Sequence, residues 1–213
     1  MTRIDIINHL IARFFPDECH YLEIGVSNPL GCFDHIQASH KVGVDPGVEH
    51  KANPVKYPYT SDEFFHRLES GKLDIPSSTR WNIVFIDGLH LAPFAFRDLL
   101  NSLNHITQPG FVLLHDCNPP TPFHAHSDHA QYMAQPGAWN GSVWKAMYHY
   151  RTQPGFRAFT VNTDWGVGIV DTRYLNENPI PPINPWFEYG VLSQSRQESL
   201  GLISPAEFLE MYS

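Results

Sequence analysis

Four ionisable side chains follow two short apolar runs in the middle of the chain. The run NIVFI ends at Asp87, with His90 three residues later, and the run FVLL ends at His115 and Asp116. Carboxylates and imidazoles are ligands that divalent cations take in proteins, and an imidazole can also accept a proton near neutral pH. Held close together, these groups could bind a metal ion and deprotonate a weakly acidic hydroxyl group.

The segment from Trp81 to Pro120 predicts the elements that must position these groups. Both apolar runs are short and unbroken, as in parallel strands that helices cover on both faces. The residues between the two runs predict a helix that has Asp98 on its polar side. Gln108-Pro109-Gly110 predicts where this helix ends. Five apolar residues at roughly helical spacing would form the other side: Phe94, Phe96, Leu99, Leu100 and Leu103. In such a β-α-β unit the ligand crevice lies beyond the carboxyl ends of the strands, where the ionisable groups are.

The composition restricts the classes of protein that fit. With 213 residues and 42% hydrophobic content, the chain is long enough for one domain with a sizeable core. The formal charge of -8 and the lack of any Lys or Arg run argue against nucleic acid as a partner. Three cysteines without a C-x-x-C pair predict neither a disulfide framework nor a thiolate zinc site, which fits a cytoplasmic protein. No stretch has the pattern of a signal peptide or a membrane span, so we expect no membrane partner.

The whole chain predicts a single α/β domain over 1–213, with an N-terminal helix (1–16), a core (18–171) and a tail (172–213). Within the core, the patterns predict strands at 20–25 and 41–45, a helix through Phe33 and Ile36, an edge strand in 55–59, a helix after Thr60, a helix at 142–151, and hairpin strands at 156–161 and 166–170. The proline-rich tail is expected to wrap the domain or a second subunit. A homo-oligomer is therefore one possible assembly of this protein.

Polar groups also close the first two predicted strands. The first ends in Glu23-Ile24-Gly25 and the second in Asp45. A carboxylate there can accept hydrogen bonds from both hydroxyls of a ribose, and a glycine lets a ligand approach the backbone without a Cβ in the way. An acid at a strand end can instead cap the next helix, but four such ends in one chain favour one shared crevice.

Over residues 18 to 171 the order of these parts resembles the class I S-adenosylmethionine-dependent methyltransferases. Within that family the chain is similar to the metal-dependent macrolide sugar O-methyltransferases, whose fourth strand ends in D-x-x-H and whose fifth ends in an acidic pair. The matching residues are Asp87-Gly88-Leu89-His90 and His115-Asp116. The resemblance implies a Rossmann-like, doubly wound, mostly parallel sheet with a C-terminal antiparallel hairpin strand. It also implies six contacts with S-adenosylmethionine: Glu23, Gly25, Asp45, Ser61, Asp62 and Asp87.

The same resemblance implies O-methylation of a small hydroxylated acceptor such as a sugar. Asp87 and Asp116 would hold a divalent ion, Mg or Mn, and His90 would take the proton of the acceptor, so these three are the predicted catalytic residues. His115 stands where the resembled group has a carboxylate. As a third metal ligand, His115 would weaken a magnesium site or shift its preference towards manganese, iron or zinc.

The segment 117–138 is rich in proline and lacks apolar periodicity, which is typical of lids and binding loops. We expect it to be mobile without ligand and to cover the acceptor. Its histidines, His124, His126 and His129, are expected to be solvated, and the nearby Trp139 to be a packing residue.

Three other functions compete with methyl transfer. A partner subunit could bind S-adenosylmethionine without catalysis. A metal-dependent hydrolase could use the histidines from His115 to His129, but Glu23 and Asp45 would then have no role. An NAD-dependent oxidoreductase is disfavoured because G-x-G-x-x-G is absent after the first predicted strand.

Overall fold

The computed structural model describes residues 1–49, 55–134 and 137–213. The strands in these residues form one sheet in the order β2-β1-β3-β4-β6-β5-β7. Their bounds are β1 (His20–Ile24), β2 (His40–Val44), β3 (Trp81–Ile86), β4 (Ile106–Leu114), β5 (Gly155–Val161), β6 (Val167–Asn176) and β7 (Leu202–Ile203). Strands β1 to β4 pair in parallel, and β6 runs antiparallel between β4 and β5. This arrangement confirms the predicted fold class.

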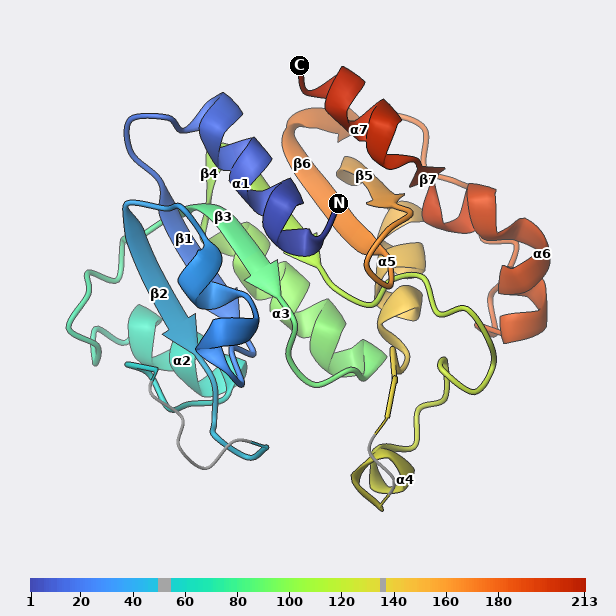
Figure 1. The fold of residues 1–213 in the computed structure, drawn as a ribbon, viewed down its shortest axis with the longest axis horizontal. Helices are drawn as coiled ribbons and strands as arrows, with labels where there is room; N and C mark the ends of the chain where they lie inside the picture. Colours follow the sequence, from blue (N-terminus) through green and yellow to red (C-terminus); the bar gives the residue numbers. More distant parts are fainter. Residues whose placement is uncertain (50–54, 135–136) are drawn as a thin grey trace.

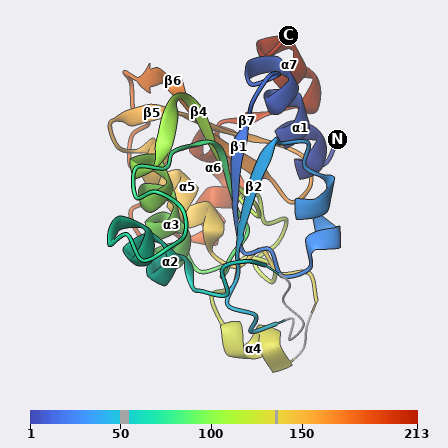
Figure 2. The ribbon, with the colours of Figure 1, turned by 90° about the vertical axis from the view of Figure 1, so that its left-hand side faces the viewer.

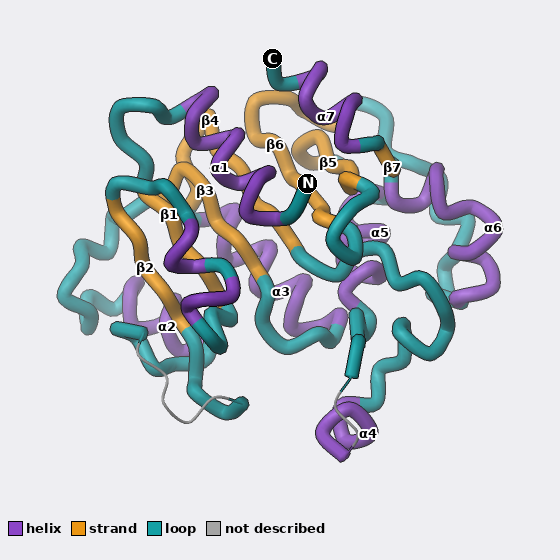
Figure 3. Tube along the Cα trace, viewed as in Figure 1, coloured by secondary structure: helices purple, strands orange, loops and turns teal. Residues whose placement is uncertain are grey.

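Helices cover both faces of the sheet (Figures 1 and 2). Their bounds are α1 (Arg3–Phe14), α2 (Ser61–Glu69), α3 (Ala92–Asn104), α4 (His129–Ala134), α5 (Val143–Arg151), α6 (Tyr189–Leu200) and α7 (Pro205–Met211). Helices α2, α3 and α5 pack on one face, and α1 and α7 pack on the other. Figure 3 shows α4 set apart from the sheet, and the arrows of Figure 1 show that the parallel strands run towards this end. None of the helices in the described part is long and apolar enough to cross a membrane.

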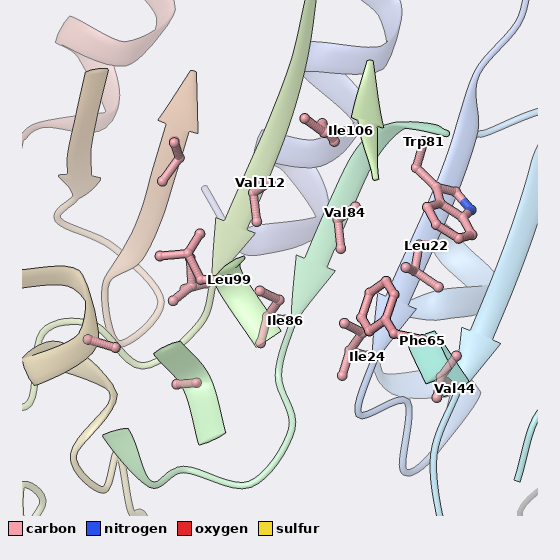
Figure 4. Packing of buried hydrophobic residues seen from close by; sticks show 14 of the residues in the cluster. Leu22, Ile24, Val44, Phe65, Trp81, Val84, Ile86, Leu99, Ile106 and Val112 are labelled. Atoms are coloured by element: carbon pink, nitrogen blue, oxygen red, sulfur yellow. The ribbon is translucent and has the colours of Figure 1, made fainter. Parts of the chain in front are cut away.

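Alternate residues of the central strands point to opposite faces of the sheet and pack into the two halves of the core. Leu22, Ile24, Val84 and Ile86 point towards α2 and α3 and are at most 4% exposed (Figure 4). Burying one such aliphatic side chain contributes about 1.5–3 kcal/mol. The strand ends that carry the polar groups are therefore anchored in a buried, close-packed core.

The two ends of the chain meet on the other face. Thr2 begins α1 with a capping box, and Ile7 and Leu10 are fully buried against the sheet. From α7, Phe208 packs in the same core cluster and its ring lies 5.5 Å from that of His9. The end of the tail thus packs on the body of the domain, which is one of the two placements that we expected.

The predicted helix through Phe33 and Ile36 is not an α-helix. Two short 3-10 turns replace it, η1 (Pro29–Gly31) and η2 (Phe33–His35). Between them Cys32 has φ -151° and ψ -61°, a conformation that interrupts any helix. Phe33 and Ile36 still pack against the core. The spacing of these apolar residues therefore correctly predicted that they are buried, but it did not predict the secondary structure.

Helix α3 turns only part of its predicted apolar side to the core: Leu99 is fully buried, and Phe96 and Leu103 pack against the same core cluster. Phe94 and Leu100 are 39% and 43% exposed, whereas Asp98, expected on the polar side, is 4% exposed. Ala95 and Ser102 are buried beside Leu99, so smaller side chains complete the inward side of α3. Gln108-Pro109-Gly110 does not end the helix either, since it lies inside β4.

Three further segments differ from the predictions. The edge strand expected in 55–59 is a single bridge between Tyr57 and Val44, because Pro58 has no N–H to continue a ladder. Helix α4 lies inside the segment 117–138, which was expected to have no regular structure. The tail also contains α6 and β7, which no apolar pattern indicated.

Candidate functional site

The ends of β3 and β4 determine the backbone positions of the predicted catalytic residues. Ile86 of β3 pairs with Leu114 of β4, so Asp87 and His115 follow at the same level of the sheet. The Asp87 N–H donates to Ile24 O at 2.8 Å, and the His115 N–H donates to Ile86 O at 3.0 Å. Because these bonds extend the ladder of a buried sheet, the two positions have little freedom.

The side chains at these strand ends converge on one point. Asp87, His90 and Asp116 have ligand atoms that all lie within 4.8 Å of one another. His90 Nε2 is 3.3 Å from both Asp87 Oδ1 and Asp116 Oδ2. His115 Nδ1 approaches the same two oxygens at 3.3 and 3.1 Å. Donors on one metal ion with bonds of about 2.0–2.2 Å are spaced by similar distances, so the donor set fits a divalent cation.

The segment before α5 holds His90 in place. His90 Nδ1 is 2.8 Å from Trp139 O, so its N–H donates there and Nε2 faces the carboxylates. The Ser142 N–H donates to His90 O at 2.8 Å. Between them Gly141 has φ +60°, and a Cβ at this position would lie 1.9 Å from His90 O. Only glycine permits this close contact.

Arg3 and Asp164 extend the cluster behind His115. His115 Nε2 is 3.5 Å from Asp164 Oδ1, and Arg3 Nη1 is 3.2 Å from Asp164 Oδ2. Burial lowers the pKa of His115, but the charge of Asp87 and hydrogen bonds to Asp116 and Asp164 outweigh burial and raise that pKa well above its usual value. A carboxylate behind an imidazole is also the arrangement that orients a metal-bound histidine.

The two residues that follow β3 have opposite pKa shifts. Burial raises the pKa of Asp87, but the charge of His115 and hydrogen bonds with both histidines hold it well below its usual range. Burial lowers the pKa of His90, but Asp87 and Asp116 raise it to about 9. Asp87 is therefore ionised at neutral pH, as a metal ligand must be.

Asn140 closes the cluster from the side of α5. Its Nδ2 donates to Asp116 Oδ1 at 2.8 Å and to Trp165 O at 3.3 Å. Its Oδ1 is buried and has no hydrogen-bond partner among the described residues. Burying an unpaired acceptor costs about 1–3 kcal/mol, so this oxygen fits a site that receives a further donor, such as a hydroxyl group or a water molecule on a metal ion.

Two predicted cofactor residues shape the turns after β1 and β2. Asp45 accepts a hydrogen bond from Ser27 N at 2.8 Å, which joins the two turns, and one from Gly47 N at 2.6 Å within its own turn. Gly25 has φ +87°, and a Cβ there would lie 2.2 Å from Asp87 O. The glycine is thus required by the packing of one turn on another, a different reason from the ligand approach that we expected.

Glu23 is buried between these turns and α1. It is 1% exposed and accepts a hydrogen bond from Tyr21 Oη at 2.5 Å. Burial raises the pKa of Glu23 to about 7, although the Tyr21 hydrogen bond opposes this shift. Glu23 is therefore close to the point of ionisation at neutral pH.

Ser61 and Asp62 begin α2, and each has a protein partner. Ser61 Oγ donates to Asp98 Oδ1 at 2.5 Å. Asp62 Oδ2 pairs with Arg97 Nη2 at 2.7 Å on the exposed surface. Neither residue belongs to the Asp87 cluster, and their contact with a cofactor stays a prediction.

The histidines of the segment 117–138 lie among aromatic rings. The rings of His126 and His129 lie 5.7 and 5.8 Å from that of Trp139, and Tyr132 of α4 stacks on Trp139 at 4.7 Å. In the described ranges, none of the three histidines belongs to a group that could hold a metal ion. Trp139 also stacks on His90 at 5.4 Å, so it joins α4 to the cluster.

A pocket of about 390 Å³ opens beside the cluster. Asn118, Asn162, Trp165 and Arg196 line it, and so does Asp164, which also faces His115. His115 therefore lies between Asp164 in the wall of the pocket and the carboxylates of Asp87 and Asp116.

Sequence reasoning missed Arg3, Asn140 and Asp164, and it treated Trp139 as packing alone. These residues come from α1, from the segment before α5 and from the β5–β6 turn. No spacing along the chain links them. The only local sign was the polar turn 162–165 between two apolar strands.

No protein-family model and no curated protein matches the chain. Its structure is similar to S-adenosylmethionine-dependent O-methyltransferases at low sequence identity. The MycE methyltransferase of the mycinamycin pathway, solved with Mg and SAH, is 15% identical, with 88% of this chain and 54% of that chain covered and a TM-score of 0.47. This chain thus spans about half the length of MycE.

Two similar structures match more of their own length. An SAH-bound methyltransferase of Podospora anserina is 15% identical, with 81% of this chain and 79% of that chain covered and a TM-score of 0.48. An O-methyltransferase of Bacillus cereus in complex with SAH is 9% identical, with coverages of 80% and 82% and a TM-score of 0.47. These likenesses concern the fold.

Proposed function

We propose that this protein is an S-adenosylmethionine-dependent O-methyltransferase that acts on a small hydroxylated acceptor with the help of a divalent metal ion. The observation that carries the proposal is the convergence of Asp87, His90 and Asp116 beyond β3 and β4. The turns with Gly25 and Asp45 lie beside them, at the carboxyl ends of β1 and β2. In an open parallel sheet this edge is where ligands bind.

The proposed roles follow from the chemistry of methyl transfer. Displacement at a sulfonium is in line, so the protein must align the acceptor and remove its proton. Asp87 and Asp116, with His115, would hold Mg or Mn, which would lower the pKa of a bound hydroxyl. Asp87 and Asp116 raise the pKa of His90 to about 9, which keeps the free imidazole protonated at neutral pH. A cation on these carboxylates would lower that pKa, so that Nε2 could take the proton, and the hydrogen bond from Nδ1 to Trp139 O keeps the ring in the required orientation.

The cofactor would lie across β1, β2 and β3. The Asp45 carboxylate would bind the ribose hydroxyls, and Glu23, Gly25 and Asp87 would complete the crevice. Ser61 and Asp62 would approach from α2. The hydrogen bonds that Asp45 accepts from Ser27 and Gly47 support this role, because they hold the carboxylate at the crevice.

The pocket beside Asp164 supports a sugar-like acceptor. Trp165 is 44% exposed and offers a flat ring face, while Asn118 and Asn162 provide amide groups for hydroxyls. About 390 Å³ is sufficient for a small ligand. The hydrolase alternative lacks comparable support, because the described histidines of 117–138 form no metal-ligand group.

Calorimetry with S-adenosylmethionine and its demethylated product tests the cofactor site. Asp45→Ala should lower the affinity at least tenfold, because it removes a charge-assisted hydrogen bond worth about 1.5–3 kcal/mol. Asp17→Ala is the control, since Asp17 is an exposed carboxylate before the amino end of β1. Unchanged affinity in Asp45→Ala would remove Asp45 from the cofactor site.

Transfer of a labelled methyl group to a panel of sugars and sugar glycosides tests the reaction. Activity with Mg or Mn, and none in chelator, is the expected result. Tight binding of S-adenosylmethionine with no transfer to any hydroxylated acceptor would favour the non-catalytic partner subunit instead.

A further inference from the structure

A second group of metal-ligating side chains lies at the opposite edge of the sheet. Glu18 precedes β1, His20 begins β1, and His40 begins β2. Their ligand atoms all lie within 4.8 Å of one another. The five residues of β1 separate this group from the Asp87 end of the sheet by roughly 16 Å. The group has no part in the proposed reaction.

Parallel strand pairing brings the two histidines together. His20 and His40 are Cα partners in the β1–β2 ladder, so their side chains leave the sheet on the same face. Their rings stack with centroids 4.5 Å apart and an angle of 24° between planes. The His20 N–H donates to Asn82 Oδ1 at 2.8 Å and the His40 N–H to Cys19 O at 3.0 Å, which hold both backbones.

The distances match the edges of a tetrahedral metal site. Glu18 Oε1 is 3.4 Å from His20 Nε2 and 3.3 Å from His40 Nε2. Ligands on a tetrahedral zinc ion with bonds of about 2.0–2.1 Å are separated by about 3.3–3.4 Å. Two imidazoles and one carboxylate are also the donors of known zinc sites that keep a fourth position for water. Magnesium, which prefers oxygen ligands, suits this set poorly.

We infer that Glu18, His20 and His40 form a zinc site that is independent of the proposed active centre. All three side chains are between 42% and 65% exposed, so the ion can enter from solvent without a change of fold. Bound there, zinc links β2, which lies at the edge of the sheet, to β1. Zinc therefore stabilises the folded protein by binding it in preference to the unfolded chain.

A zinc titration against a competing chromophoric chelator tests this inference. We expect the wild type to bind one more equivalent of zinc than the double variant His20→Asn/His40→Asn. The variant Asp87→Asn/Asp116→Asn should keep that equivalent, which separates this site from the proposed active centre. His66→Asn, which removes an exposed histidine of α2, is the matched control and should bind as the wild type does.

Thermal unfolding with and without zinc provides a second readout. Zinc should raise the unfolding midpoint of the wild type and of His66→Asn by several degrees, and should leave that of His20→Asn/His40→Asn unchanged. Equal stoichiometry in the wild type and the double variant, or an equal rise of their midpoints, would overturn the inference. The side chains of His20 and His40 are 42% and 57% exposed, so their replacement should preserve the fold. Circular dichroism spectra that match the wild type verify this for every variant.

Discussion

Replacement of Asp98 by asparagine should stabilise the protein, by an amount that depends on pH. Asp98 on α3 is 4% exposed, and its Oδ1 accepts a hydrogen bond from Ser61 Oγ. Burial raises the pKa of Asp98 from 3.8 to about 6, and the Ser61 hydrogen bond offsets only part of this shift. Asparagine has nearly the same shape and still accepts from Ser61, but it carries no charge that must be desolvated.

The sign and size of the effect follow from the two pKa values of Asp98. Because its pKa is higher in the folded state, the folded protein keeps a proton that the unfolded chain has lost. The free energy of unfolding therefore falls as pH rises from about 4 to about 6, and stays low above that range. A pKa difference of about two corresponds to about 3 kcal/mol. Asp98→Asn should recover up to this amount near pH 7.5 and only about 0.5 kcal/mol near pH 4.

Urea unfolding of the ligand-free protein near pH 4, 6 and 7.5 measures this difference. Asp62→Asn is the control, because Asp62 forms an exposed ion pair with Arg97 that is worth about 1 kcal/mol or less. If Asp98→Asn is no more stable than the wild type near pH 7.5, or gains equally near pH 4, the reasoning is refuted.

Four other outcomes are expected. His90→Ala should lower turnover about 100-fold or more with nearly unchanged affinity for S-adenosylmethionine, because Nε2 faces the carboxylates; wild-type turnover would remove His90 as the base. Chelation should abolish transfer and Asp116→Asn should raise the metal concentration needed, whereas full activity in chelator would exclude the metal. Limited proteolysis should cut the segment 117–138 faster than the rest of the ligand-free chain, and cofactor with acceptor should slow the cut; equal rates would contradict the lid. Thr2→Ala should lower the free energy of unfolding by about 1 kcal/mol, because it removes the capping box of α1; urea unfolding measures this loss, and an unchanged value would show that the cap contributes nothing.

The sequence by itself determined the order and type of six of the seven strands of the sheet, β1 to β6. The strands of the central unit, the Thr2 and Thr60 caps and the antiparallel hairpin depend on residues within one or two turns of each other. The meeting of Asp87 and Asp116 was also predictable, because both follow buried strands that a helical crossover makes parallel neighbours.

Only the tertiary structure decided which side chains surround these carboxylates. Arg3, Asn140 and Asp164 reach the cluster from segments that lie far apart in the chain, and Asp98 is buried where α3 meets Ser61 of α2. Periodicity reports that a side of a helix is apolar, but which side meets the sheet depends on the shapes of both surfaces. Contacts between distant segments depend on that packing, and no local spacing encodes it.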